Sequence, residues 1–337
     1  MISPRSVLLA AAAILTTTLA VHAASAPTKL VIAYASIGPR VAPLWAAQEL
    51  GFFKKNGIEA ELIFIRGAPT LVAALTSGDM NIGYTGGTAV LGASVAGIDL
   101  KILAGLTNRV TYDLVARPGI KGAEDLRGKR FGVTSIGGTL WMGGVLGLER
   151  LGIDANRDDI RFLVIGDQTL LSQALEDGRI DATVLDIVFS RRLSEKGFPI
   201  LAELHKTNLP IISTSIVARS VYIQKNSRLM ENFIKALLEG MAFVLGPANK
   251  AATLKLLQRR LRVSEREAEE GFTDMAIGMD KKPYPSLDGL RNIQRLMKIR
   301  NPKLEKAKVE ELVDDQILRR LDESGFIDRL YASYGVK

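Results

Sequence analysis

Short apolar runs alternate with helix-like runs from residue 29 onward. The apolar runs are rich in β-branched residues and contain few polar positions, as expected for parallel strands that are covered on both faces. Alternation of strands and helices in this way is typical of a doubly wound α/β sheet. The expected strands lie at 30–34, 60–65, 80–86 and 100–107, and the expected helices at 43–50, 70–78 and 88–97.

The same alternation starts again about 100 residues later. The motif Ser-Ile-Gly at 36–38 recurs at 135–137, each time between an apolar run and a helix-like segment that contains a tryptophan. Two further pairs match in the same order: Gly-Ile-Glu-Ala at 57–60 with Gly-Ile-Asp-Ala at 152–155, and Ala-Leu-x-x-Gly at 74–78 with the same pattern at 174–178. Three matches at a nearly constant offset predict two lobes of equivalent structure.

The segment after residue 219 has a different, helical pattern. Leu229, Phe233, Ala236 and Leu237 recur at helical spacing, and we expect these helices to pack on the first lobe. We therefore predict a first lobe made of 28–116 and 219–337 and a second lobe of 117–218. Two crossing strands, near 115–119 and 215–219, would form a hinge, and the cleft between the lobes would bind the ligand.

The strand-to-helix corners are the expected binding site. Ligands of doubly wound sheets bind at the carboxyl ends of the strands, where helix N-termini offer unpaired N–H groups and partial positive charge. A small anionic group can take these donors, glycine lets the backbone approach, and Ser or Thr adds a hydroxyl. The candidate ligand-binding residues are Ser36, Gly38, Gly67, Thr85, Gly86, Gly87, Thr88, Ser135, Gly137, Gly138, Thr139 and Asp186.

Two of these candidates have alternative roles. Thr139 is expected to cap the helix that follows it, with Pro43 marking the corresponding helix start in the first lobe. Asp186 would either contact a ligand amine or hydroxyl, or cap the helix that begins at Ile187. For any single corner, a purely geometric use of Gly, Ser and Thr is as plausible as binding.

Arginines and aromatic residues near the corners leave the ligand open. Arg40, Arg66 and Arg109 could each pair with a carboxylate or sulfonate, although arginines on surface loops are more often solvated. The aromatic residues are expected to pack in the core rather than to stack on a ligand; they are Tyr34, Trp45, Tyr84, Tyr112 and Trp141.

The first 23 residues are expected to be a cleaved signal peptide. Arg5 precedes an apolar stretch of 15 residues, 7–21, which is shorter than the roughly 20 that a spanning helix needs, and small residues surround Ala23. The chain of 337 residues has no cysteine, which excludes disulfides and a lipid anchor at the cleavage site. We therefore expect a periplasmic protein that meets the membrane only through a partner. Its net charge of +8 is placed late and without interleaved aromatics, which argues against nucleic acid.

These segments resemble a known family. Residues 43–86 are similar to the opening of the periplasmic solute-binding proteins of ABC importers for nitrate, alkanesulfonates, taurine and thiamine precursors, and 119–133 with 174–186 resemble the second lobe of that family. The resemblance implies a type II periplasmic-binding fold, a small-molecule ligand, and an ABC permease with its ATPase as partners. It also places the candidate corner residues along the cleft. We expect a monomer that captures a small, anionic organic or oxyanion ligand.

Enzymatic chemistry finds little support in the residues. His205 is the one histidine after the signal segment, and no partner acid and nucleophile can be identified for it. No His, Cys or carboxylate cluster has metal-ligand spacing. We expect no catalytic residue, no metal site and no cofactor. The alternative to a transport receptor is a sensing module of the same fold that signals through a partner, with an exported enzyme less favoured.

Overall fold

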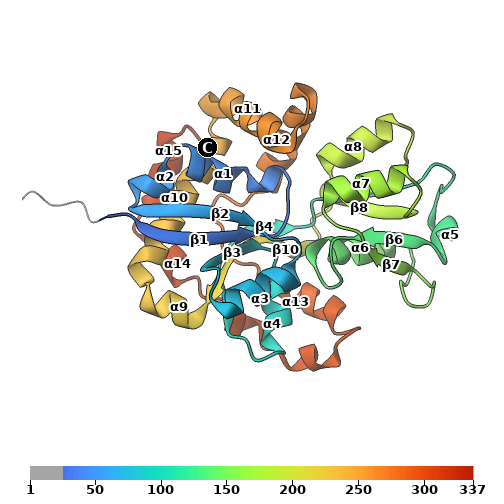
Figure 1. Cartoon of the computed structure of the whole chain (residues 1–337), viewed down its shortest axis with the longest axis horizontal. Coiled ribbons are helices and arrows are strands. Elements are labelled where there is room, and N and C mark those ends of the chain that lie inside the picture. The colour runs from blue at the N-terminus through green and yellow to red at the C-terminus, as the bar shows by residue number, and fades with distance from the viewer. Residues whose placement is uncertain (1–25, 337) are drawn as a thin grey trace, which may run out of the picture.

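The computed structural model describes residues 26–336, so the expected signal peptide at 1–23 lies outside the described residues. Two α/β lobes lie side by side, each built on its own five-stranded sheet (Figure 1). The strands of the first sheet are β1 (Thr28–Tyr34), β2 (Ile58–Phe64), β3 (Ile82–Thr85), β4 (Leu100–Arg109) and β10 (Pro210–Arg219). Those of the second sheet are β5 (Tyr112–Ala116), β6 (Arg130–Val133), β7 (Arg161–Val164), β8 (Ala182–Asp186) and β9 (Ile200–Glu203).

The two sheets share one topology. Their strand orders are β2-β1-β3-β10-β4 and β7-β6-β8-β5-β9. In each sheet the first three strands of the order are parallel, and the fourth strand runs antiparallel to its neighbours. Because β6, β7 and β8 occupy the places of β1, β2 and β3, the expectation of two equivalent doubly wound lobes is confirmed.

The antiparallel strand of each sheet comes from the other half of the chain. β5 pairs with β8 in the second sheet, with Tyr112 opposite Asp186, and β10 pairs with β3 and β4 in the first. The chain therefore crosses at 110–111 and returns before Pro210, whereas the sequence placed these crossings near 115–119 and 215–219. Both strands are buried almost along their whole length, and burial does not depend on which sheet a strand joins, so the sequence pattern could not show the pairing of either one.

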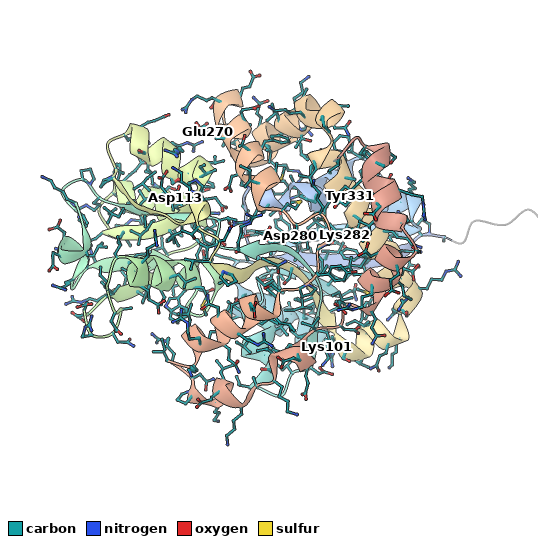
Figure 2. All side chains as sticks on the ribbon, turned by 180° about the vertical axis from the view of Figure 1, so that it is seen from behind. Lys101, Asp113, Glu270, Asp280, Lys282 and Tyr331 are labelled. Atoms are coloured by element: carbon teal, nitrogen blue, oxygen red, sulfur yellow. The ribbon has the colours of Figure 1, made fainter. Side chains whose placement is uncertain are left out.

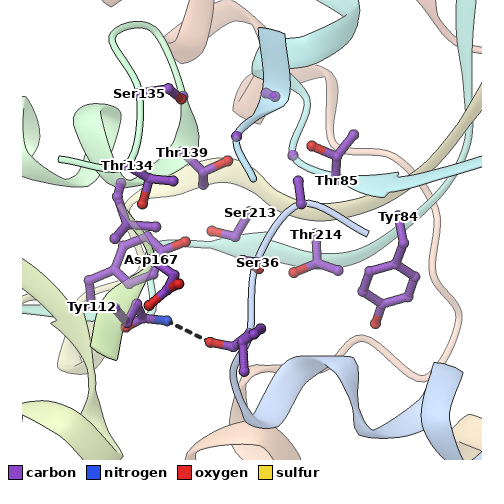
Figure 3. A pocket seen from close by; sticks show the side chains of 18 residues that line it. Ser36, Tyr84, Thr85, Tyr112, Thr134, Ser135, Thr139, Asp167, Ser213 and Thr214 are labelled. Atoms are coloured by element: carbon purple, nitrogen blue, oxygen red, sulfur yellow. Dashed lines mark hydrogen bonds between the residues drawn. The ribbon is translucent and has the colours of Figure 1, made fainter. Parts of the chain in front are cut away.

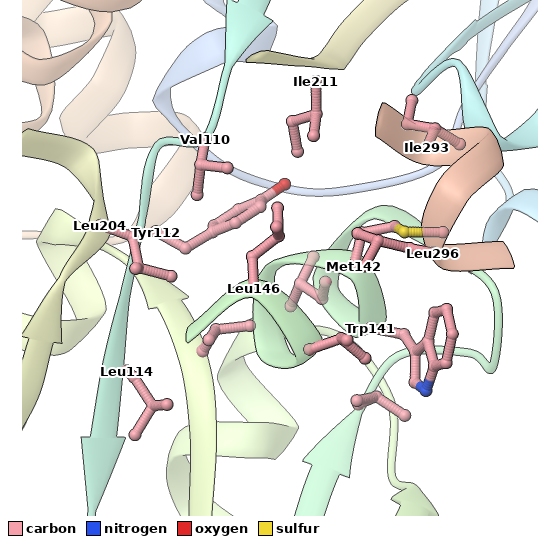
Figure 4. Packing of buried hydrophobic residues seen from close by; sticks show 14 of the residues in the cluster. Val110, Tyr112, Leu114, Trp141, Met142, Leu146, Leu204, Ile211, Ile293 and Leu296 are labelled. Atoms are coloured by element: carbon pink, nitrogen blue, oxygen red, sulfur yellow. The ribbon is translucent and has the colours of Figure 1, made fainter. Parts of the chain in front are cut away.

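The two crossing segments lie beside each other. The Val110 amide donates to the Leu209 carbonyl at 3.0 Å, and Pro210 pairs with Arg109. Apolar packing is continuous across this point, from Leu114, Leu146 and Leu204 in the second lobe through Val110 and Ile211 to Ile293 and Leu296 (Figure 4). Two adjacent backbone segments therefore connect the lobes, and buried apolar side chains pack on both sides of them.

Helices cover both faces of each sheet. In the first part of the chain they are α1 (Ala42–Glu49), α2 (Phe52–Lys55), α3 (Ala68–Ser77) and α4 (Thr88–Ser94). The second lobe carries α5 (Ala123–Leu126), α6 (Thr139–Arg150), α7 (Gln168–Glu176) and α8 (Ile187–Glu195). Short 3-10 turns are η1 (Pro39–Val41), η2 (Leu204–Lys206), η3 (Pro247–Asn249), η4 (Pro302–Lys306) and η5 (Val309–Leu312).

The C-terminal helices do more than cover the first lobe. They are α9 (Ser220–Lys225), α10 (Ser227–Leu245), α11 (Lys250–Leu261), α12 (Glu265–Gly278), α13 (Leu287–Met297), α14 (Gln316–Glu323) and α15 (Phe326–Ser333). α10 packs on the first lobe as expected, with the Phe233 ring stacked on Phe53 at 5.7 Å. α12 and α13 also reach the second lobe, through the ion pairs Glu267–Arg192 at 2.6 Å and Arg295–Glu149 at 2.9 Å.

Within residues 26–336, none of the helices combines the length and apolar character that a membrane span requires.

The contact between α10 and α1 yields a stability test. A Cβ on Gly240 would overlap the carbonyl oxygen of Pro43, which is backbone and cannot rotate away. We expect Gly240→Ala to lower the free energy of unfolding by about 1–3 kcal/mol, measured by urea denaturation. The matched control is Gly92→Ala in α4, where the nearest atom, Met297 Cε, lies 3.7 Å away. That control should raise stability by about 0.5–1 kcal/mol, because alanine favours helix over glycine. Equal effects of the two substitutions would contradict the packing argument.

Candidate functional site

A small cavity of about 40 Å³, lined by both hydroxyl-bearing and apolar residues, lies between the two lobes. Figure 3 shows hydroxyl groups of Ser36, Thr85 and Thr214 from the first lobe on one side and those of Thr134, Ser135 and Thr139 from the second lobe on the other. Both Ser-Ile-Gly corners therefore face the same cavity. The lining residues that the sequence singled out as ligand-binding are Ser36, Gly67, Thr85, Gly86, Ser135, Gly138 and Thr139.

The first-lobe corners are strand ends that turn directly into helices. β1 ends at Tyr34, and the chain passes Ser36 and Ile37 before η1 and α1, whose first turn contains Pro43 as expected. Gly67 has φ +83°, a left-handed conformation that favours glycine, and α3 begins at the next residue. The Ala35 carbonyl accepts from the Gly67 amide at 3.4 Å, which holds the first two corners together.

The second-lobe corner is a tight turn between β6 and α6. The Gly138 amide donates to the Ser135 carbonyl at 3.2 Å, and Gly137 has φ +76°, so glycine is required there. The cap position of α6 is Gly138, and Thr139 is the first helical residue rather than the cap. This corrects the expected role of Thr139. α6 begins at Thr139, one residue earlier than expected. The Thr139 side chain lines the cavity and lies against Gly86 of the opposite lobe.

Ser135 has a property that points to a ligand. Its Oγ is buried and has no hydrogen-bond partner among the described residues. A buried hydroxyl without a partner costs on the order of 1–3 kcal/mol, and this cost is removed when a bound molecule accepts or donates a hydrogen bond.

Five candidate residues lie outside the cavity. Thr88 and Gly137 line a neighbouring apolar groove, and Gly87 packs against Ile212, Leu290 and Ile293. Gly38 and Asp186 lie behind the cavity wall, where they meet each other. Apart from Asp186, these positions carry glycine or threonine, as several lining positions do, so residue type alone could not separate the two groups.

The structure adds lining residues that the sequence analysis did not select as binding: Ala35, Ile37, Ala68, Tyr84, Tyr112, Thr134, Leu140, Asp167, Gln168, Ser213 and Thr214. Ser213 and Thr214 come from β10, which the sequence assigned to the second lobe. Gln168 stands at the start of α7, where nothing local distinguishes it from a solvated residue. Tyr84 and Tyr112 were expected in the core; each is buried and also contributes to the cavity wall.

A buried ion pair joins the lobes directly behind the cavity. Arg40 of η1 is 5% exposed and its Nη2 lies 2.8 Å from Oδ1 of Asp186, which is 1% exposed. The Arg40 guanidinium also lies over the ring of Tyr112, at 4.7 Å from the centroid. The expectation that Arg40 is solvated is wrong, because η1 turns its side chain inwards against the second lobe.

Asp186 is held by Gln168 as well as by Arg40. Gln168 Nε2 donates to Oδ2 of Asp186 at 2.5 Å and to the Ile37 carbonyl of the other lobe at 3.2 Å, while Gln168 Oε1 accepts from the Asp186 amide at 2.7 Å. Asp186 is the residue before α8, yet its side chain makes no capping hydrogen bond. The capping role proposed for it is therefore wrong, because the carboxylate turns to Arg40 instead.

Burial and the ion pair together shift the pKa values of Arg40 and Tyr112. Burial alone would lower the pKa of Arg40, but the Asp186 carboxylate opposes this and holds that pKa above its ordinary value. Burial raises the pKa of Tyr112 to about 12, although the nearby Arg40 partly offsets this, so Tyr112 stays a neutral hydroxyl. Behind the cavity, the positive charge of Arg40 is already matched by a carboxylate.

The other two arginines are at the rim. Arg66 is half exposed and lies 3.3 Å from Asp167 across the cleft, where Asp167 also caps α7. Arg109 is partly exposed and donates to the Ile277 carbonyl at 2.5 Å. Neither lines the cavity.

Glycines make the close approach of the lobes possible. A Cβ on Gly38 would overlap Oδ2 of Asp186, and one on Gly86 would overlap the Thr139 hydroxyl. A Cβ on Gly67 would lie 3.2 Å from the Ser135 hydroxyl. In each case a first-lobe glycine meets a second-lobe side chain, so these positions serve the contact between lobes as much as the ligand.

His205 has a partner acid that the sequence did not reveal. Its Nδ1 lies 2.5 Å from Oδ1 of the fully buried Asp113, and the hydrogen bond with this carboxylate raises the pKa of His205. Ser190 Oγ donates to the other oxygen of Asp113 at 2.7 Å rather than to the histidine. Both side chains thus bind one carboxylate, and the Ser–His hydrogen bond of a nucleophilic triad is not formed among them. Within residues 26–336, no group of three or more His, Cys, Asp or Glu is placed to hold a metal ion.

The comparison with protein families decides the assignment. Residues 38–251, which include the second lobe, part of the first lobe and most of the cavity wall, match the family described as NMT1/THI5 like. The chain belongs to the NMT1/THI5-like family. The resemblance seen in the sequence is therefore confirmed.

Two curated relatives of this NMT1/THI5-like protein carry the description of candidate binding proteins. YtlA of Bacillus subtilis (strain 168) is 25% identical over 231 residues, covering 67% of this chain and 69% of the relative. A protein of Brucella abortus (strain 2308) is 26% identical over 239 residues, covering 67% of this chain and 70% of the relative.

Solved structures establish the fold of this NMT1/THI5-like protein. A protein of Bordetella bronchiseptica RB50 has a TM-score of 0.75 at 18% identity, covering 88% of this chain and 98% of that one. The alkanesulfonate-binding protein SsuA of Xanthomonas axonopodis pv. citri, bound to MOPS, has a TM-score of 0.69 at 17% identity, covering 86% and 99%. The periplasmic nitrate-binding protein NrtA of Synechocystis PCC 6803 has a TM-score of 0.67 at 14% identity, covering 88% and 89%. The expected periplasmic-binding fold is confirmed.

Gly38 provides a test of the lobe contact. All three atoms nearest to a Cβ at this position belong to Asp186 and Gln168 of the second lobe, and the extended backbone there accepts any residue. We expect Gly38→Ala to hold the lobes apart, seen as a larger radius of gyration in small-angle X-ray scattering, with urea stability unchanged. Gly122→Ala is the control, because no atom lies within 4 Å of its Cβ position. A Gly38→Ala chain as compact as the parent would contradict this geometry.

Proposed function

We propose that this protein is the substrate-binding receptor of an ABC importer. It captures a small, anionic organic or oxyanion ligand between its lobes and delivers it to a membrane permease and its ATPase. The observation that carries the proposal is the cavity itself, because hydroxyl groups from both lobes converge on one space at the carboxyl ends of the strands. The family membership and the fold support it.

Closure follows from the way the donors are divided. Ser36 and Thr85 belong to the first lobe and Ser135 and Thr139 to the second, so a ligand makes its full set of hydrogen bonds only when the lobes meet. The closed arrangement therefore gains contacts that an open one lacks, and the ligand shifts the equilibrium by that difference. A permease can then distinguish the loaded receptor by its shape.

The chemistry of the cavity favours neutral donors over a counter-ion. Arg40 is matched by Asp186 and Arg66 by Asp167, so hydroxyl and backbone N–H groups are left to hold an anionic group. Binding without turnover is supported by the arrangement of Ser190, Asp113 and His205, in which the serine is not activated by the histidine.

The periplasm is the compartment that fits this function. The signal-like segment at 1–23 supports export, and the absence of cysteine from the sequence leaves no residue for a lipid anchor. The receptor would act as a soluble monomer that reaches the membrane only by docking on the permease.

The test is a titration of the mature protein with nitrate, alkanesulfonates, taurine, aromatic carboxylates and pyrimidines by calorimetry and thermal shift. We expect one class to bind, and Ser135→Ala to weaken that binding about tenfold, the worth of one hydrogen bond of roughly 1–1.5 kcal/mol. Ser333→Ala is the control, because its hydroxyl bonds only within α15 on the outer surface. The proposal fails if no small molecule in a panel of several hundred metabolites stabilises the chain.

A further inference from the structure

One face of α12 lies against the second lobe. Glu267, Gly271, Asp274 and Gly278 follow each other at helical spacing and are all buried. Glu267 pairs with Arg192 of α8, and a Cβ on Gly271 would lie 2.6 Å from Val188 of α8 and 2.9 Å from Pro39 of η1. Asp274 stands one turn further along the same face. Its carboxyl is therefore enclosed where α12, η1 and the second lobe meet.

Asp274 faces a group of charges that is already balanced. Arg40 is paired with Asp186, and His205 with Asp113. Figure 2 shows Asp113 inside the second lobe and Glu270 on the neighbouring α12. An ionised Asp274 would add a third carboxylate to two cations, at a position that is only 8% exposed. The titratable and charged groups around it are Arg40 on η1, Asp186 before α8, Arg192 on α8, Tyr112 and Asp113 on β5, His205 on η2, Arg109 on β4, and Glu267 and Glu270 on α12 itself.

We propose that closing the cleft takes up one proton at the carboxyl of Asp274, beside the Arg40–Asp186 pair. This inference rests on the proposed function in one respect: the closure that takes up the proton is the same closure that captures the ligand. When the lobes separate, α12 loses its contact with α8, and Asp274 meets water. The proton is then released, so the open and closed forms differ in charge as well as in shape.

The direction of the pH dependence follows from the two environments. Burial, with the neighbouring Asp186 carboxylate, raises the pKa of Asp274 to about 7 in the closed form, although Arg40 and His205 oppose this. In the open form we expect a value near the ordinary one, about 4. Below that value both forms are protonated and closure is most favourable. Closure weakens as pH rises between the two values and becomes constant above the higher one.

His205 does not account for the same effect. The Asp113 hydrogen bond, which raises the pKa of His205, lies within the second lobe and survives opening. Protonated His205 lowers the pKa of Asp274, so its charge acts against proton uptake by Asp274 rather than in its place.

The absence of cysteine allows a direct measurement of closure without any ligand. Nitroxide labels on Lys54→Cys in the first lobe and Gln173→Cys in the second give a distance distribution by pulsed electron resonance; both positions are exposed. We expect the closed-to-open ratio to fall by ten- to a hundredfold between pH 5 and pH 8. Asp274→Asn, which mimics the protonated acid, should abolish this change and keep the chain closed at pH 8.

Two controls separate Asp274 from other acids and from the histidine. Glu265→Gln removes one negative charge from an exposed position on the same helix and should leave the pH dependence intact. His205→Gln should leave the fall between pH 5 and pH 8 in place. The proposal is overturned if the labelled parent shows one distribution at both pH values, or if Asp274→Asn retains the dependence of the parent.

The parent measurement is decisive even if Asp274→Asn does not fold, because it needs no change at Asp274, and Asp274→Ser provides a second neutral variant. The outcome is also distinct from that of the ligand titration. Loss of the pH effect in a chain that binds a small molecule refutes proton uptake and leaves the receptor function standing. If the chain binds no small molecule but still shows the pH effect, the receptor function is refuted and proton uptake at Asp274 is supported.

Discussion

The arrangement of this protein depends on one buried ion pair between its halves. Arg40 and Asp186 come from different lobes and lie together with almost no exposure to water. Removing one partner of such a pair costs about 3–5 kcal/mol, because the other charge is left buried and unpaired. When the lobes open, however, both charges regain water. The pair therefore fixes the orientation in which the lobes meet, but it adds little to the free energy that favours the closed arrangement. That free energy is left for the ligand to supply.

The ion pair can form because the two sheets are assembled from exchanged strands. β5 sits beside β8 in the second sheet, and β10 beside β3 in the first. The crossing segments run next to each other at Val110 and Leu209, so both connections between the sheets pass through a single narrow region. A motion about that region brings the carboxyl ends of both sets of parallel strands together. The corners, the cavity and the ion pair all lie on this one edge.

Two kinds of residue lie at this edge and have different roles. Hydroxyl side chains face the cavity, and glycines let the opposite lobe come close. Gly38 and Gly86 meet Asp186 and Thr139, respectively, while Ser36 and Ser135 remain directed to the space between them. The first Ser-Ile-Gly motif thus combines a serine hydroxyl that faces the cavity with a glycine that leaves room for the opposite lobe. In the second copy the glycine, Gly137, serves a left-handed turn instead, so the two copies are alike in position but not in every role.

The sequence by itself determined the parts of this protein that depend on local pattern. Apolar runs, helix-like runs and the repeat at an offset of about 100 residues were enough for two doubly wound lobes and for corners at 36–38, 67, 85–88 and 135–139. Strand alternation and turn chemistry are short-range properties, so they are visible in one sequence. Only the tertiary structure decided which sheet β5 and β10 join, that Arg40 turns inwards to Asp186, and that Asp274 completes their surroundings. These features depend on residues that are far apart in the sequence, such as Arg40 and Asp186 or Tyr112 and Asp186, and a charged side chain carries no local sign of the partner it will meet.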